Sequence, residues 1–263
     1  MTEYALEVTG IGKTFAEGRG TKHVLENISF HVKAGEFVSI IGPSGSGKST
    51  LFHLIGGLER PTSGEIRMDG QCVTGERGRI AYMPQSASLL PWLTVRTNIV
   101  MALTIAGTER GAAEAQTSEW LARVGLAGEA DAYPDTLSGG MQQRVSFLRA
   151  LLSPQRLMCL DEPFGALDAL TRLHMQTWLL SLWEADRRSV LFVTHSIEEA
   201  LLLSDRILVL SPSPAIVAKE IEVPFARPRS EALWTDPLFN ELKLEIYEML
   251  KPTAGHGAMM GKR

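Results

Sequence analysis

The sequence has few cysteines and no long apolar run, and each absence narrows the possible class of protein. Its 263 residues include only two cysteines, Cys72 and Cys159, which form neither a disulfide framework nor the ligand spacing of a zinc site. The most apolar stretch, Leu201–Leu210, is interrupted by polar residues and is far shorter than the roughly 20 apolar residues of a membrane span. We therefore expect a protein of a reducing cytoplasm. Residues 1–10 lack the basic start and apolar run of a secretory signal, and we expect none.

An excess of positive charge is also missing. The 26 Lys and Arg residues are outnumbered by 30 Asp and Glu residues, which gives a net charge of −4 at pH 7. Proteins that bind nucleic acid usually carry a basic patch or a high pI, so no nucleic-acid partner is expected. Hydrophobic residues make up 44% of the chain, which is enough for the core of one large α/β domain or two small ones.

Strands dominate both ends of the main part of the chain, and helices dominate its middle. Early strands are expected at Ala5–Val8, Asn27–Val32 and Phe37–Ile41, and a second strand pair turns at Asp69-Gly70. From residue 86 to about residue 154 the periodicity becomes helical, at Val95–Leu103, Ala112–Val124 and Gly139–Leu152. This change predicts a helical subdomain inserted into an α/β core.

Three later strands are apolar throughout. They are Leu157–Leu160, Val190–Val193 and Ile207–Leu210, and continuous apolar strands are typical of a parallel sheet covered by helices on both faces. Residues 211–228 are expected to form an edge hairpin and an exit loop. One amphipathic helix is expected at Pro237–Leu250, followed by a disordered tail from Lys251 onward.

A glycine-rich segment between the strand Phe37–Ile41 and a helix carries the clearest chemistry. It contains Gly42, Pro43, Ser44, Gly45, Ser46, Gly47, Lys48, Ser49 and Thr50, which match the pattern GxxxxGK[ST] of a P-loop. The backbone N–H groups of such a loop and the N-terminus of the following helix bind phosphates. Lys48 can reach the β- and γ-phosphates, and the Ser49 hydroxyl can bind Mg²⁺. The alternative, a plain turn with an exposed lysine, does not explain the flanking strand and helix.

Two acids follow the strand Leu157–Leu160 directly. Open α/β sheets bind ligands at the carboxyl ends of their strands, so Asp161 and Glu162 are expected beside the P-loop. We expect Asp161 to hold Mg²⁺ through its water shell and Glu162 to polarise the water that attacks the γ-phosphate. The alternative is an acidic pair that merely begins a loop or a helix. Cys159, inside the strand, is expected to be a core thiol.

The segment Leu137–Arg144 (LSGGMQQR) is a helix start with Ser138 as its N-cap. Lying between a P-loop and an Asp-Glu strand, it resembles the signature of the ABC ATPase family. The resemblance extends over residues 4–223. It implies a homodimer in which Ser138, Gly139 and Gly140 of one chain meet the γ-phosphate held by Lys48 of the other, around a two-fold axis.

Four further residues take roles only through this resemblance. Gln85 is similar to the glutamine that contacts Mg²⁺ and the attacking water, and His195 to the histidine that hydrogen-bonds the γ-phosphate. Asp168 resembles the residue that crosses the dimer, although it is equally suited to cap a helix near Ala169. Phe15 resembles the aromatic residue that stacks on adenine, and packing is its alternative role. The resemblance implies the ligands ATP and Mg²⁺.

The implied fold is a P-loop NTPase core with a parallel sheet, an N-terminal antiparallel β-subdomain and an inserted helical subdomain. The ATPase domain is expected at 1–223, with its core at 1–85 and 155–223 and its helical subdomain at 86–154. Residues 224–263 would form the C-terminal helix and tail.

The implied function is ATP hydrolysis that drives an ABC membrane transporter from the cytoplasmic face of the membrane. The segment from Leu89 to Trp92, which is apolar for a loop, is expected either to receive a membrane permease or to cap the core of the helical subdomain. The sequence resembles the importer branch for nitrate, sulfonates and taurine, and also relatives that import thiamine precursors. Such importers work with a solute-binding protein. The alternative is a soluble ABC ATPase that acts on nucleic acid or ribosomes. A P-loop kinase or GTPase has no use for the signature segment.

Overall fold

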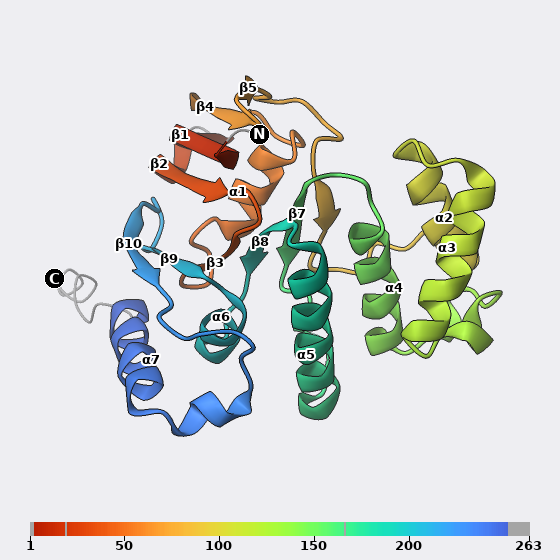
Figure 1. The fold of residues 1–263 in the computed structure, drawn as a ribbon. Coiled ribbons are helices and arrows are strands. Elements are labelled where there is room, and N and C mark those ends of the chain that lie inside the picture. The colour runs from red at the N-terminus through yellow and green to blue at the C-terminus, as the bar shows by residue number, and fades with distance from the viewer. Residues whose placement is uncertain (1–2, 19, 166, 252–263) are drawn as a thin grey trace, which may run out of the picture.

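The structure is a computed structural model that describes residues 3–18, 20–165 and 167–251. It contains two sheets and a group of helices set to one side of them (Figure 1). Most of the predicted C-terminal tail, residues 252–263, lies outside the described residues. Among the described residues, no helix is both long and apolar enough to span a membrane.

The first sheet is antiparallel and has the strand order β2-β1-β4-β5. Its strands are β1 (Tyr4–Glu17), β2 (Gly20–Lys33), β4 (Ser63–Met68) and β5 (Gln71–Cys72). The predicted turn at Asp69-Gly70 joins β4 to β5, and both residues have positive φ angles, as a tight hairpin requires. The short early strands predicted at Ala5–Val8 and Asn27–Val32 were wrong in length, because β1 and β2 each continue for 14 residues.

Bulges explain this difference. The pairing of β1 with β2 shifts its register between Val8 and Ile11, and again between Ile11 and Lys13. Gly10, inside the first of these irregular stretches, has a φ of +62°. Bulges interrupt the alternation of inward and outward side chains, so a search for period-two hydrophobicity ends the strand too early.

The second sheet has the order β10-β9-β3-β8-β7-β6. The strands β6, β7, β8, β3 and β9 run parallel, and β10 pairs antiparallel with β9. An edge hairpin is therefore present, but residues 211–228 supply only its second strand, and β9 is the first. Their bounds are β3 (Phe37–Ile41), β6 (Ala81–Met83), β7 (Leu157–Asp161), β8 (Ser189–Val193), β9 (Arg206–Leu210) and β10 (Val217–Glu222). The predicted parallel sheet is confirmed. The short strand β6 was not predicted, because three residues before a proline carry no periodic signal.

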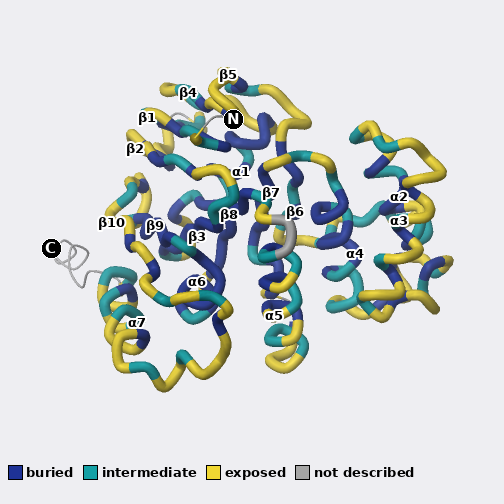
Figure 2. The backbone as a smooth tube through the Cα atoms, in the orientation of Figure 1, coloured by how far each residue is buried: buried dark blue, intermediate teal, exposed yellow. Residues whose placement is uncertain are grey.

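The central strands of this sheet are buried on both faces (Figure 2). On β8, Val190 and Phe192 pack with residues of the helices α2 to α5, whereas Leu191 and Val193 pack with α1 and the first sheet. β7 alternates in the same way, and its Cys159 lies in the core, as expected. Two apolar clusters therefore lie on opposite faces of the sheet.

The helices are of three groups. The first lies along the second sheet: α1 (Lys48–Ile55), α5 (Ala169–Asp186) and α6 (Ile197–Leu203). The second forms the lateral group: α2 (Val95–Ile105), α3 (Arg110–Arg123) and α4 (Gly139–Leu151), with the 3-10 turns η1 (Ala127–Glu129) and η2 (Pro134–Thr136). The third is C-terminal: η3 (Glu231–Thr235) and α7 (Pro237–Leu250). The apolar stretch Leu201–Leu210 is divided between the end of α6, which was not predicted, and β9.

Candidate nucleotide site

The glycine-rich loop after β3 curls around the side chain of Lys48. Lys48 Nζ donates hydrogen bonds to the carbonyl oxygens of Gly42 (2.9 Å) and Pro43 (3.0 Å). The Ser46 N–H donates to the Pro43 carbonyl oxygen (3.2 Å), which closes the turn. Burial lowers the pKa of Lys48, and the nearby Glu162 and Asp161 carboxylates oppose this shift. The loop thus holds a cation at the N-terminus of α1, where a helix already favours anions.

Two glycines allow the loop to take this path. Gly45 and Gly47 have φ angles of +77° and +88°, in the region that side chains disfavour. A Cβ atom at Gly47 would lie 2.7 Å from Val24 Cγ1 and 2.9 Å from Leu25 Cδ2. For Gly45, none of the described residues lies within 4 Å of the added atom. The two positions therefore share the conformational requirement but differ in packing.

We predict that Gly47→Ala destabilises the protein more than Gly45→Ala. Both variants meet the left-handed backbone penalty of about 1–2 kcal/mol, and Gly47→Ala adds an overpacking cost of about 1–3 kcal/mol. Urea denaturation of the two variants beside the wild type measures the difference in the free energy of unfolding. Equal losses would contradict the close packing of Gly47 on β2.

The two acids lie where β7 ends, and their surroundings differ. Asp161 is only 2% exposed. Burial raises its pKa, and a hydrogen bond from the Ser49 hydroxyl is the largest opposing influence. Glu162 has a φ of +49°, which is uncommon for a residue with a side chain. Its N–H donates to the Val193 carbonyl oxygen (2.9 Å). This bond ties the end of β7 to the end of β8. The Glu162 side chain lines the same cleft as Lys48.

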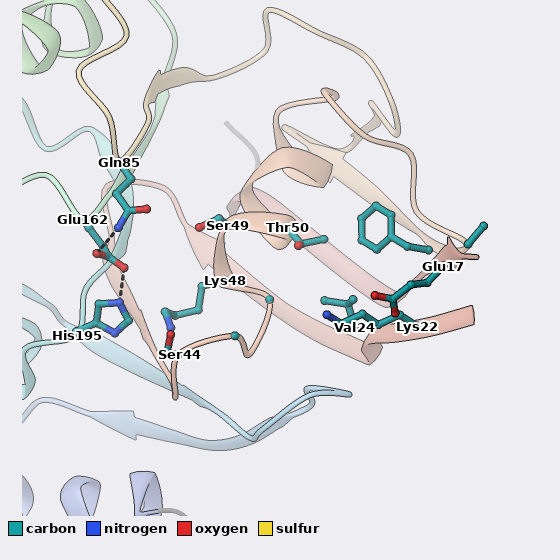
Figure 3. Close-up of a pocket in the computed structure, with 14 residues that line it drawn as sticks. Glu17, Lys22, Val24, Ser44, Lys48, Ser49, Thr50, Gln85, Glu162 and His195 are labelled. Carbon is teal, nitrogen blue, oxygen red and sulfur yellow. Dashed lines mark hydrogen bonds and ion pairs between the residues drawn. The ribbon is translucent and has the colours of Figure 1, made fainter. Parts of the chain in front are cut away.

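Two predicted residues, Gln85 and His195, contact the Glu162 carboxylate, as Figure 3 shows. Gln85 Nε2 donates to Glu162 Oε2 (2.9 Å), and His195 Nε2 lies 2.5 Å from Glu162 Oε1. Each residue follows a different strand: Gln85 comes after β6, Glu162 after β7 and His195 after β8. The parallel order of these strands brings the three side chains to one edge of the sheet.

A cleft of about 560 Å³ extends from this carboxylate across the P-loop to the tips of β1 and β2 (Figure 3). This volume suits a ligand of nucleotide size. Phe15 lines the cleft together with Glu17 and Lys22, and Lys13 Nζ lies 4.6 Å from the centre of its ring. The predicted site residues that line the cleft are Phe15, Ser44, Gly45, Gly47, Lys48, Ser49, Thr50, Gln85, Glu162 and His195. The cleft lining does not include Gly42, Pro43, Ser46 and Asp161, which belong to the loop and to the buried end of β7.

The other predicted residues form a second group. Ser138 caps α4, and its hydroxyl accepts from the Met141 N–H (3.3 Å). Asp168 caps α5 and accepts from the Thr171 N–H (3.1 Å). Both capping interpretations are confirmed. A Cβ atom at Gly140 would lie 3.1 Å from Leu167 Cδ2, so the starts of the two helices adjoin. Within the described chain, Ser138, Gly139, Gly140 and Asp168 all lie outside the lining of the cleft.

Two side chains of α4 that the sequence analysis missed hold the segment after Gln85. Gln143 Nε2 donates to the Gln85 carbonyl oxygen (3.0 Å). The Arg149 guanidinium donates to the carbonyl oxygens of Ser88 (3.0 Å) and Ala87 (3.4 Å). The helix that begins at the signature segment is therefore fastened to the loop that carries Gln85. The sequence gives no signal for this contact, because Gln142 and Gln143 are equivalent until the face of the helix is known.

The fold and the cleft define a P-loop nucleoside triphosphatase. Residues 25–165 match the sequence profile of the family described as "ABC transporter". An aliphatic sulfonates import ATP-binding protein of Bacillus thuringiensis is 39% identical over 255 residues, which are 97% of this chain and 98% of the relative. A formylaminopyrimidine import ATP-binding protein of Halalkalibacterium halodurans is 48% identical over 76% of this chain and 78% of its own length. A nitrate import ATP-binding protein of Synechocystis is 43% identical over 83% of this chain and 82% of its own length.

Two solved structures that resemble this chain are also ATP-binding cassettes. An ATP-binding cassette, solved as a dimer in a post-hydrolysis state with ADP and Pi, superposes with a TM-score of 0.76 at 32% identity. The superposition covers 84% of this chain and all of that one. The chain belongs to the ABC transporter family. It is an ATP-binding and ATP-hydrolysing protein of that family, and the fold predicted from its sequence is confirmed.

Proposed function

We propose that this chain drives a membrane importer of a small solute by hydrolysing ATP between two copies of itself. The observation that carries the proposal is the junction of Gln85, Glu162 and His195 beside Lys48. The names of the relatives, which import sulfonates, nitrate and a formylaminopyrimidine, support a solute of one of these classes. A solute-binding protein and attachment at the cytoplasmic face of the membrane are parts of the same proposal.

Five residues of the cleft have roles in this proposal. Lys48 neutralises the β- and γ-phosphates while the loop N–H groups bind their oxygens. Glu162 accepts the proton of the attacking water, and Gln85 and His195 orient that water and the γ-phosphate around it. Phe15 supplies an aromatic face for adenine at the far end of the cleft. Hydrolysis then depends on groups that three neighbouring strands hold in place.

Mg²⁺ fits the polar groups near the P-loop. Asp161 Oδ1 is buried and accepts no hydrogen bond within the described part of the chain, which leaves an acceptor for a hydrated cation. No cluster of three or more His, Cys, Asp or Glu side chains among the described residues suits a metal by itself. Mg²⁺ commonly binds one or two protein groups together with substrate phosphates. Asp161 and Ser49, with Gln85 nearby, would hold the ion, which would neutralise charge on the phosphates.

We propose a division of the chain into three parts. We take residues 1–85 and 155–223 as the nucleotide-binding core, residues 86–154 as the helical subdomain, and residues 224–263 as a C-terminal addition. The Gln85 loop and α4 connect the first two parts. In this position a movement at the γ-phosphate would pass into the helical subdomain.

We propose that the segment from Leu89 to Trp92 contacts a permease. Trp92 is 70% exposed, which is unusual for so large an apolar side chain. Leu89 packs against the core cluster, so the two proposed uses of the segment, core cap and contact surface, fall on different residues. The segment follows the carbonyls that Arg149 holds, and is therefore linked to Gln85.

Trp92→Glu is predicted to lower ATP-dependent solute uptake by the assembled transporter at least about 10-fold, since a charge in a buried contact costs several kcal/mol. Basal ATP hydrolysis by the free subunit should change little, because the side chain lies outside the cleft. Leu244→Glu on α7, another exposed apolar residue, is the control and should leave uptake intact. Uptake is measured in vesicles that contain the permease. Wild-type uptake by the Trp92 variant would exclude this surface as the permease contact.

A further inference from the structure

A buried carboxylate lies under the loop that carries His195. Glu199 belongs to the first turn of α6 and is only 7% exposed. The Thr194 hydroxyl donates to its Oε2 atom, and Gln176 Nε2 donates to its Oε1 atom (2.9 Å). Arg172 Nε lies 3.9 Å from the same oxygen. Buried charge is costly unless it is paired, so these partners fix Glu199 in one position.

The contacts of Glu199 reach both neighbours of His195. Thr194 precedes His195 in the chain, and its hydroxyl oxygen also accepts a hydrogen bond from the Ser196 N–H (3.0 Å). The Ser196 hydroxyl in turn accepts from the Glu199 N–H (3.2 Å). The residues on both sides of His195 are therefore fastened to the first turn of α6. His195 itself is exposed, and its Nε2 atom lies 2.5 Å from Glu162 Oε1.

The same carboxylate joins this loop to α5. Gln176 and Arg172 both belong to α5, the helix that Asp168 caps. An Arg172 nitrogen donates to the Leu167 carbonyl oxygen (2.9 Å), one residue before Asp168. A continuous set of contacts thus runs from the start of α5 through Glu199 and Thr194 to His195 and Glu162.

We propose that Glu199 is a positioning residue for ATP hydrolysis, which holds the Thr194–Ser196 loop so that His195 meets Glu162 and which links this loop to α5. The inference rests on the role proposed for His195 in the cleft. Glu199 lies behind the loop and is not among the residues that line the cleft. It acts through His195 and not by contact with ATP.

The test is a double-mutant cycle between Glu199→Ala and His195→Ala, measured as steady-state ATP hydrolysis. Alone, Glu199→Ala should lower kcat by about 10- to 100-fold, as misplaced catalytic groups commonly do. The KM for ATP should change less than about threefold, because the P-loop contacts are untouched. Added to His195→Ala, the Glu199 change should lower kcat by no more than about twofold further, because its effect is routed through the missing ring.

Conservative variants separate positioning from simple loss of structure. Glu199→Gln should retain most of kcat. Its amide oxygen can accept the hydrogen bond from the Thr194 hydroxyl, and the Gln176 amide can turn so that its oxygen accepts a hydrogen bond from the new NH₂ group. Glu222→Ala, which removes an exposed carboxylate at the end of β10, is the control. Glu198 on the same turn is unsuitable, because its carboxylate accepts from the Ser196 hydroxyl (3.3 Å) as well as pairing with Lys243 (2.6 Å). If Glu199→Ala does not fold, the pair Thr194→Val and Thr194→Ser tests the same hydroxyl in the same cycle.

Two results would count against the inference, and they differ. Suppose that His195→Ala lowers kcat and that adding Glu199→Ala to it lowers kcat again by as much as Glu199→Ala does alone. Glu199 then does not act through His195, and the positioning role is wrong. If His195→Ala hydrolyses ATP at the wild-type rate, the role proposed for His195 fails, and the positioning role fails with it.

Discussion

Replacing Glu162 with glutamine is expected to lower the rate of ATP hydrolysis by about 10²- to 10⁴-fold, the usual range for loss of a general base. Glutamine keeps the size of the side chain and an oxygen that can accept from Gln85. It cannot take a proton from water at neutral pH. Because Lys48 and the loop N–H groups are unchanged, ATP affinity should stay within about threefold of wild type.

The comparison needs two assays on the same samples. Phosphate release measures hydrolysis, and fluorescence titration with a nucleotide analogue measures binding. Glu222→Gln, an exposed carboxylate at the end of β10, makes the same chemical change away from the cleft and should leave both values as they are. If Glu162→Gln retained more than about a tenth of the wild-type rate, another group would have to accept the proton of the water.

The residues of the P-loop could be predicted because their spacing alone encodes their chemistry. Gly42–Thr50 follow a buried strand and precede a helix, and these flanks are themselves visible as apolar patterns. Asp161 and Glu162 were predictable for the same reason, since they end an apolar run. The sequence also indicated that Ser138 and Asp168 would cap helices, because a cap is a local feature of the chain.

Contacts between elements were beyond the reach of the sequence. Gln143 and Glu199 are ordinary helix residues until the packing of α4 and α6 decides which way each side chain points. The junction at Glu162 likewise depends on strand order, which the chain determines only after β6, β7 and β8 pair. The early strands were underestimated because bulges in β1 break the alternation on which a strand prediction depends.

The second large effect that we expect is on dimer formation, and it concerns the three residues at the start of α4. Ser138, Gly139 and Gly140 form a glycine-led helix N-terminus, a ready site for an anion, and within the described chain they lie outside the lining of the cleft. In a head-to-tail dimer they would meet the γ-phosphate that the other chain holds. Two such contacts would be formed in each dimer, and a shift from 1:99 to 99:1 in favour of the dimer requires about 5.5 kcal/mol. Charge-assisted hydrogen bonds to two phosphates are strong enough to supply this.

A substitution at Gly139 can block the contact between the start of α4 and the γ-phosphate of the other chain. Its added Cβ would meet none of the described residues within 4 Å, and it does not need a positive φ angle, so Gly139→Glu should fold and still bind ATP at the P-loop. A carboxylate at this helix tip would repel the γ-phosphate of the other chain. The double variant Glu162→Gln with Gly139→Glu is therefore expected to stay a monomer with ATP bound.

The most direct test is the mass of Glu162→Gln in saturating MgATP, measured by size-exclusion chromatography with light scattering. One chain has a mass of 28.8 kDa, and we predict twice that mass with ATP, a single-chain mass without nucleotide, and a single-chain mass for the Gly139→Glu double variant. If Glu162→Gln with ATP bound kept the mass of one chain, ATP would not join two copies, and the account would be contradicted at its centre.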